Sequence, residues 1–147
     1  MVKALVVYHS QQHGNTEKMA NSVADGLKSE GCEVTLHNAN EKRYPIDSLP
    51  EYDVVAVGTP DYYSYIAGSL KTLMDDFYFL KRRIEYTKRP VGLFYTHGGG
   101  GRVRDSLAIF GGLGDQVGEA VESNGAPDKK VLDSCYNLGV NLAKAKI

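Results

Sequence analysis

Three short apolar runs, separated by longer segments of helical periodicity, constrain the fold of this chain more than any other feature of its sequence. The runs lie within Lys3–Tyr8, Tyr52–Val57 and Pro90–Tyr95, and each has the length and continuous hydrophobicity of a strand buried on both faces. Such strands belong to parallel sheets that helices cover on both sides. The segment Glu33–His37 alternates in polarity and suits a sheet edge, and a fifth strand is expected near Gly118–Glu122.

The segments between these strands carry apolar residues at the spacing of one helix face. Helices are expected over four ranges of the sequence: 19–27, 66–80, 103–110 and 131–142. Asn15 or Thr16 is the expected N-cap of the first helix, and Gly31 suits the position just after its end. The stretch from Asn38 to Pro50 is polar and contains two prolines, which predicts an irregular connection. The pattern of βαβ units predicts a single α/β domain.

Composition excludes several classes of function. The formal net charge is −1, which gives no basic surface of the kind that binds nucleic acid. No apolar run approaches the roughly 18 residues of a membrane span, and no signal peptide is recognisable, so we expect a cytoplasmic protein without a membrane partner. Cys32 and Cys135 are far apart in the sequence and are expected to be reduced thiols.

The loop after the first run carries groups that suit an anion. It reads His9-Ser10-Gln11-Gln12-His13-Gly14-Asn15-Thr16, contains no acidic residue and opens into a helix. A glycine lets the backbone wrap closely around a ligand, and a helix N-terminus favours negative charge. A phosphate-binding loop is therefore one interpretation, and a polar turn with an N-cap is the other. The motifs of NTPase and dinucleotide-binding loops are absent.

Two further loops follow the third and fourth expected strands, at the sheet edge where ligands of open α/β sheets bind. The first, Thr59–Tyr65, holds three tyrosines, and the second has four consecutive glycines, Gly98–Gly101, after Thr96 and His97. Tyrosines and bare backbone could enclose a flat heterocycle, since aromatic stacking contributes about 0.5–1.5 kcal/mol beyond burial. The tyrosines suit a partner interface equally well, and the glycines suit a flexible surface loop.

Other chemistry is disfavoured by spacing. His9, His13, His37 and His97 form no His–carboxylate pair with the spacing of a zinc site, so no metal is expected. The first strand ends in Tyr8-His9-Ser10, without the carboxylate that a phosphoacceptor domain needs.

In these loops the chain resembles the flavodoxins and the flavodoxin-like quinone reductases, along nearly its whole length. The first loop is similar to the family's phosphate loop through Gly14-Asn15-Thr16, followed by Glu17–Ala20. The second resembles a Gly-Thr-Pro…Ala-Gly-x-x-Lys pattern, carried here by Gly58, Thr59, Pro60, Ala67, Gly68 and Lys71. The third has the family's Thr-x-Gly-Gly-Gly character. The first loop is one residue longer than the family's, with His13 in place of the middle threonine, and the chain has no tryptophan.

The resemblance implies a flavodoxin-like α/β fold, a three-layer doubly wound five-stranded parallel sheet of strand order 2-1-3-4-5, with residues 1–147 as one FMN-binding domain. No catalytic residue or metal ligand is assigned. FMN is expected to contact residues from all three loops: Ser10, Gln12, His13, Gly14, Asn15, Thr16, Thr59, Pro60, Asp61, Tyr62, Tyr63, Ser64, Tyr65, Thr96, His97, Gly98, Gly99, Gly100 and Gly101. Asp61, if near the ring, would disfavour the anionic reduced flavin; the alternative is a solvated turn residue.

The resemblance leaves three functions open. We favour an electron-transfer flavodoxin, a carrier without a substrate of its own, over an NAD(P)H-dependent quinone or flavin reductase. The third hypothesis is a binding module that uses the same fold without flavin. The expected partner is a redox protein or a small electron acceptor such as a quinone, with NAD(P)H as a further candidate. Monomer and homo-oligomer are both compatible with the sequence.

Overall fold

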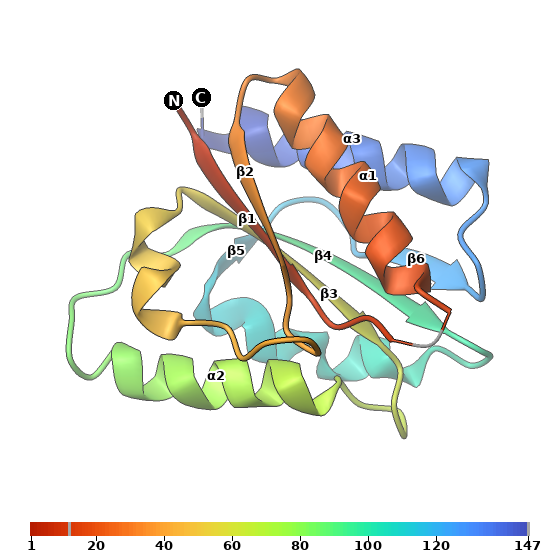
Figure 1. Ribbon diagram of the computed structural model, residues 1–147, viewed down its shortest axis with the longest axis horizontal. Coiled ribbons are helices and arrows are strands. Elements are labelled where there is room, and N and C mark those ends of the chain that lie inside the picture. The colour runs from red at the N-terminus through yellow and green to blue at the C-terminus, as the bar shows by residue number, and fades with distance from the viewer. Residues whose placement is uncertain (12, 147) are drawn as a thin grey trace.

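A six-stranded sheet in which every strand pairing is parallel forms the centre of the computed structural model, which describes residues 1–11 and 13–146 (Figure 1). The strands are β1 Lys3–Tyr8, β2 Glu33–Asn38, β3 Val54–Pro60, β4 Arg89–His97, β5 Gly114–Gln116 and β6 Val121–Asn124. Their order is β2-β1-β3-β4-β5, with β6 also paired to β4. The predicted α/β class and the strand order 2-1-3-4-5 are therefore confirmed.

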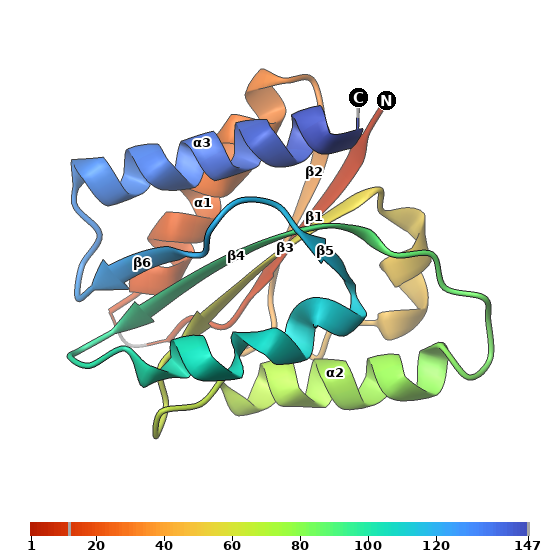
Figure 2. The same cartoon turned by 180° about the vertical axis from the view of Figure 1, so that it is seen from behind.

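Helices cover both faces of the sheet, which gives three layers (Figures 1 and 2). The α-helices α1 Asn15–Ser29 and α3 Lys129–Lys146 lie side by side on one face. The other face carries α2 Gly68–Leu80 and two 3-10 helices, η1 Ile46–Glu51 and η2 Arg102–Gly112. None of the helices in the described part of the chain has both the length and the hydropathy needed to cross a membrane.

The central strands are buried on both faces, as their continuous hydrophobicity predicts. Along β1, Leu5 and Val7 belong to the core beneath α2 and the 3-10 helices. Ala4, Val6 and Tyr8 belong to the core beneath α1 and α3. Because successive side chains of a strand point to opposite faces, one apolar run supplies both cores.

The fifth strand position differs from the prediction. Instead of one strand near Gly118–Glu122, two short strands share it: β5 pairs with Arg89–Val91 and β6 pairs with Phe94–His97. Val117 still donates to the carbonyl of Val91 at 2.8 Å, after which residues 118–120 leave the sheet, and Gly118 has a φ of 67°. A left-handed residue bends the chain away from the extended path, so the edge strand is interrupted.

The helix expected at 103–110 is present and is a 3-10 helix, Arg102–Gly112. Leu107, Phe110 and Leu113 are all buried and lie three residues apart. A 3-10 helix has three residues per turn, so this spacing places the three side chains on one face.

The expectation at Gly31, just after the end of α1, is confirmed. The backbone N–H of Gly31 donates to the carbonyl of Lys28 and that of Cys32 to the carbonyl of Leu27, which are the hydrogen bonds of a Schellman motif.

Helices α1 and α3 approach each other closely through two glycines. A Cβ atom added to Gly139 would overlap the carbonyl oxygen of Val23, and one added to Gly26 would overlap that of Tyr136. The absence of side chains at these two positions therefore sets the distance between the helices, and with it the position of α1 over the sheet.

We expect Gly139→Ala to lower the free energy of unfolding by about 2–3 kcal/mol, because the new methyl group must force the two backbones apart. Urea denaturation measures the loss. Gly68→Ala is the matched control, since a Cβ there meets no atom within 4 Å, and it should cause no loss. Equal stability of the two variants would contradict the role of Gly139 in helix packing.

Candidate functional site

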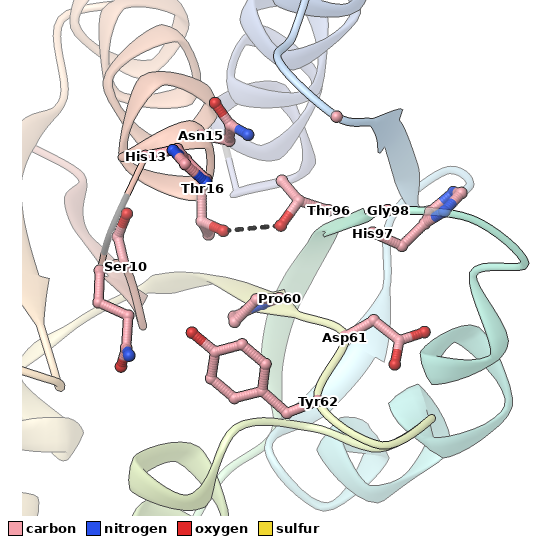
Figure 3. Close-up of a pocket in the computed structure, with 12 residues that line it drawn as sticks. Ser10, His13, Asn15, Thr16, Pro60, Asp61, Tyr62, Thr96, His97 and Gly98 are labelled. Atoms are coloured by element: carbon pink, nitrogen blue, oxygen red, sulfur yellow. Dashed lines mark hydrogen bonds between the residues drawn. The ribbon is translucent and has the colours of Figure 1, made fainter.

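A cavity of about 260 Å³ opens at the carboxyl ends of β1, β3 and β4 (Figure 3). Its walls come from the loops after these strands, from the first turn of α1 and from the loop after β6. The lining residues are Ser10, Gln11, His13, Asn15, Thr16, Pro60, Asp61, Tyr62, Thr96, His97, Gly98 and Gly125. The three loops that the sequence singles out therefore meet at one site.

The predicted cofactor-binding residues fall into two groups. Those that line the cavity are Ser10, His13, Asn15, Thr16, Pro60, Asp61, Tyr62, Thr96, His97 and Gly98. Those outside its lining are Gly14, Thr59, Tyr63, Ser64, Tyr65, Gly99, Gly100 and Gly101. Gln12 lies outside the described residues. Contact of any of these residues with a cofactor stays a prediction.

Two lining residues were not among the predicted ones. Gln11 lies inside the predicted phosphate loop, and its amide side chain is the signal that could have included it. Gly125 follows β6, which ends at the same edge of the sheet as the three central strands. Because the fifth strand was expected to end at Glu122, no sequence pattern pointed to Gly125.

Ser10 is held in place by a side chain from a neighbouring strand. The amide of Asn38, the last residue of β2, accepts from the Ser10 backbone N–H at 3.1 Å and donates to the Ser10 carbonyl at 3.0 Å. The Ser10 hydroxyl oxygen accepts from the backbone N–H of Glu17 at 3.2 Å. The hydroxyl hydrogen of Ser10 is therefore left to donate to another acceptor.

The N-cap prediction for α1 is wrong. The cap residue is Gly14, with a φ of 70°, and it makes no side-chain hydrogen bond to the helix. The left-handed conformation favours glycine over asparagine or threonine at this position. Ser10, four residues earlier, supplies the oxygen that a capping side chain normally supplies.

Two buried threonines join the first helix to the end of β4. Thr16 Oγ1 and Thr96 Oγ1 lie 3.0 Å apart, and both side chains are buried (Figure 3). One hydroxyl donates to the other, so the acceptor retains a hydrogen that it can donate elsewhere. Both residues line the cavity.

The tyrosine loop is a tight hairpin. Tyr62 and Tyr65 exchange two backbone hydrogen bonds of 3.1 Å, and the residues between them, Tyr63 and Ser64, have φ values of 55° and 63°. Positive φ at both central residues is characteristic of a type I′ turn, which usually contains asparagine or glycine. Only Tyr62 of this hairpin lines the cavity, and burial raises the pKa of its phenol, which stays protonated at neutral pH.

Asp61 and Thr59 hold this hairpin against the rest of the fold. The Asp61 carboxylate accepts from the backbone N–H of Ser64 at 2.8 Å and from that of Val103 at 3.0 Å. Both of its oxygens are thus engaged by backbone, as expected for a turn residue. Thr59 is fully buried, and its hydroxyl accepts from the N–H of Ala67, just before α2, at 3.1 Å.

His97 belongs to a network beside the cavity. Its Nδ1 accepts from the backbone N–H of Gly99 at 3.0 Å, and its Nε2 donates to the Glu122 carboxylate at 2.7 Å. Arg104 pairs with the same carboxylate at 2.6 Å and donates to the Tyr95 hydroxyl at 3.0 Å. The hydrogen bond from His97, followed by that from Arg104, lowers the pKa of Glu122 below its usual value.

The described residues contain no group of three or more His, Cys, Asp or Glu side chains arranged to hold a metal ion. The site therefore offers hydroxyl, amide and backbone donors around the first turn of α1, and an aromatic ring, an imidazole and a glycine around the remainder of the cavity. Such a set suits a ligand with an anionic end and a flat ring.

A family model described as flavodoxin matches residues 6–130 of the chain. The coenzyme F420H2 oxidase of Methanocaldococcus jannaschii is 30% identical over 145 residues, a match that covers 97% of this chain and 35% of that protein. An NAD(P)H dehydrogenase (quinone) of Brucella anthropi is 33% identical over 93 residues, which covers 51% of this chain and 46% of the dehydrogenase. The chain thus spans less than half the length of these relatives.

Solved structures have the same fold. A flavodoxin from the domain Archaea superimposes with a TM-score of 0.80 at 22% identity, with 98% of each chain covered. The rubredoxin:oxygen oxidoreductase of Desulfovibrio gigas gives a TM-score of 0.83 at 21% identity, with 97% of this chain and 35% of the oxidoreductase covered.

We expect Glu122 to stabilise the folded protein at neutral pH and to lose this contribution in acid. A carboxyl whose pKa is lower in the folded than in the unfolded chain stabilises the fold above its unfolded-state pKa, and the effect disappears as the pH falls through the folded value. Because the side chain is 42% exposed, the contribution should be no more than about 1 kcal/mol.

The free energy of unfolding, measured in urea between pH 7 and pH 3, tests this expectation. It should fall more steeply below pH 4.5, the usual value for the group, in the wild type than in Glu122→Gln. Glu119→Gln, at an exposed neighbouring position, is the control and should follow the wild type. Superimposable curves for Glu122→Gln and the wild type would contradict the expectation.

Proposed function

The chain belongs to the flavodoxin family, and we propose that it is an electron carrier that holds one FMN non-covalently in the cavity at the carboxyl edge of its sheet. Flavodoxins bind FMN, and this cofactor supplies reversible electron transfer when bound. The proposal includes residues 1–147 as one FMN-binding domain and a cytoplasmic location. Its partner is a redox protein or a small electron acceptor.

The donors around the first turn of α1 fit the phosphate of FMN. The hydroxyls of Ser10, Thr16 and Thr96 and the amide of Asn15 all line the cavity. The first-turn backbone N–H groups have no acceptor within the helix, and the helix dipole is positive there. We therefore assign the phosphate to this end, where neutral donors compensate its charge.

The other part of the cavity fits the ring. Tyr62 offers an aromatic face, and Gly98 allows a ligand to approach the backbone without a side chain in between. His97 lies between this loop and Glu122, so its imidazole holds the glycine loop through Gly99. These residues bind and orient the ring and exclude water from one side of it.

The observation that carries the proposal is the convergence of three loops, from positions near 10, 60 and 97 of the sequence, on one cavity at the first turn of a helix. Asp61 also lines the cavity, and the effect of its negative charge on the reduced flavin stays a prediction. Both of its oxygens accept backbone hydrogen bonds from Ser64 and Val103, which supports its interpretation as a turn residue.

The second candidate is an NAD(P)H-dependent quinone or flavin reductase. The match to the Brucella quinone dehydrogenase favours it, since the identity of 33% covers half of this chain. The dehydrogenase extends well beyond the matched part, however, so its activity does not transfer by similarity alone. The third candidate, a module without flavin, predicts that the protein takes up no FMN.

We expect Ser10→Ala to weaken FMN binding about tenfold and to leave riboflavin binding nearly unchanged, because the lost hydroxyl hydrogen bond goes to a charged phosphate that riboflavin lacks. Fluorescence titration of both flavins against the apoprotein measures the two dissociation constants. Ser134→Ala, which removes an exposed hydroxyl on α3, is the control. An equal loss for both flavins would place the phosphate elsewhere, and no uptake of FMN by the wild type would refute the proposed function.

Anaerobic reduction distinguishes the carrier from the reductase. For a carrier, dithionite should bleach the flavin absorbance of the holoprotein, whereas NADH and NADPH should not. The physical reason is that hydride transfer requires the nicotinamide to be bound against the flavin ring in a reactive orientation. Rapid bleaching by either nucleotide, with turnover on a quinone, would replace the first candidate with the second.

A further inference from the structure

A buried histidine, His9, contacts two residues that line the cavity, Gln11 and Tyr62, and has no part in the function proposed above. It is the residue that follows β1, and only 6% of it is exposed. Its backbone N–H donates to the carbonyl of Gly58 at 3.1 Å, which continues the pairing of β1 with β3. The backbone of His9 is therefore fixed at the carboxyl edge of the sheet, next to β3.

Both nitrogens of the imidazole have partners in other parts of the site. Nδ1 lies 2.6 Å from the hydroxyl oxygen of Ser69, in the first turn of α2. Nε2 lies 2.8 Å from the side-chain oxygen of Gln11, in the loop after β1. A carbonyl oxygen only accepts, so Nε2 carries the hydrogen of this bond. In the neutral imidazole Nδ1 then accepts from the Ser69 hydroxyl.

The third neighbour of His9 is Tyr62. The two ring centroids are 5.5 Å apart and the ring planes are almost perpendicular, at 88°. This is the edge-to-face arrangement that aromatic rings prefer. Tyr62 and Gln11 both line the cavity, whereas His9 does not.

The hydrogen bond from His9 determines which end of the Gln11 amide is available to a ligand. With the oxygen engaged by Nε2–H, the NH2 group is the end left to hydrogen-bond in the cavity. A free glutamine side chain can rotate its amide and present either end. Fixing the amide in advance reduces the entropy lost when a ligand accepts from it.

We propose that His9 is a positioning residue for the cofactor site, which orients the Gln11 amide as a hydrogen-bond donor toward FMN and holds the ring of Tyr62 beside it. The inference rests on the proposed function, because the ligand is FMN. The inference goes beyond the proposed function by assigning a role to a buried residue that does not touch the ligand.

A double-mutant cycle tests the coupling. His9→Phe keeps an aromatic ring against Tyr62 and removes both nitrogens, and Gln11→Ala removes the amide. Each single variant should weaken FMN binding about tenfold, the scale of one hydrogen bond. The double variant should bind FMN no more than about tenfold more weakly than the wild type, since Gln11 is a productive donor only when His9 orients it.

His37→Phe is the matched control. His37 makes the same two kinds of contact away from the cavity, an edge-to-face contact with Tyr44 at 5.2 Å and a hydrogen bond from Nε2 to the Lys42 carbonyl at 2.6 Å. It should leave the dissociation constant of FMN and the visible circular dichroism of the bound flavin unchanged. His9→Phe should change both, because the dichroism reports the orientation of groups around the ring.

Three outcomes would overturn the proposal. The first is a loss of FMN affinity of about a hundredfold in the double variant, which is what independent contributions of His9 and Gln11 predict. The second is an effect of His9→Phe on the stability of the apoprotein alone. The third is wild-type protein that binds no FMN. Only the last also refutes the proposed function, so the two failures are distinguishable. Should His9→Phe not fold, Ser69→Ala replaces it in the cycle. It should weaken FMN binding with Gln11 present and have no effect in Gln11→Ala, and additive losses would again overturn the proposal.

Discussion

Parallel pairing of β1, β3 and β4 is the constraint on which the rest of the structure depends. Because these strands run in the same direction and are buried on both faces, their carboxyl ends meet at one edge. The loops that follow them start only a strand's width apart, although they lie far apart in the sequence. The cofactor site proposed at this edge follows from the sheet itself and needs no dedicated pocket within the core.

Hydrogen bonds between the loops then shape the site. The side chain of Asn38 hydrogen-bonds to the backbone of Ser10, and the hydroxyls of Thr16 and Thr96 hydrogen-bond to each other. The carboxylate of Asp61 joins the tyrosine hairpin to the backbone of Val103. The first bond joins the two ends of one βαβ unit, and the other two connect segments of different units. Such connections limit the motion of the loops, and a site arranged in advance binds its ligand with a smaller loss of conformational entropy.

The strands could be predicted because hydrophobic runs are a local property. The run Lys3–Tyr8 has the predicted bounds, and the third strand is displaced by only a few residues. The predictions failed where backbone conformation depends on more distant contacts. At Gly14 a left-handed residue replaces the expected side-chain cap. The helix expected at 103–110 is present, but burial at a spacing of three residues favours 3-10 geometry there.

By itself the sequence determined the α/β class and the three loops of the site, since both are recognisable from short stretches of neighbouring residues. The tertiary structure alone decided which loop residues meet in the cavity. In the folded protein Thr59 is buried and accepts a hydrogen bond from the residue before α2, the side chain of Tyr63 is exposed, and Ser69 contacts His9. Side-chain partners sixty positions apart leave no local pattern, because their contact depends on how the sheet and helices pack together.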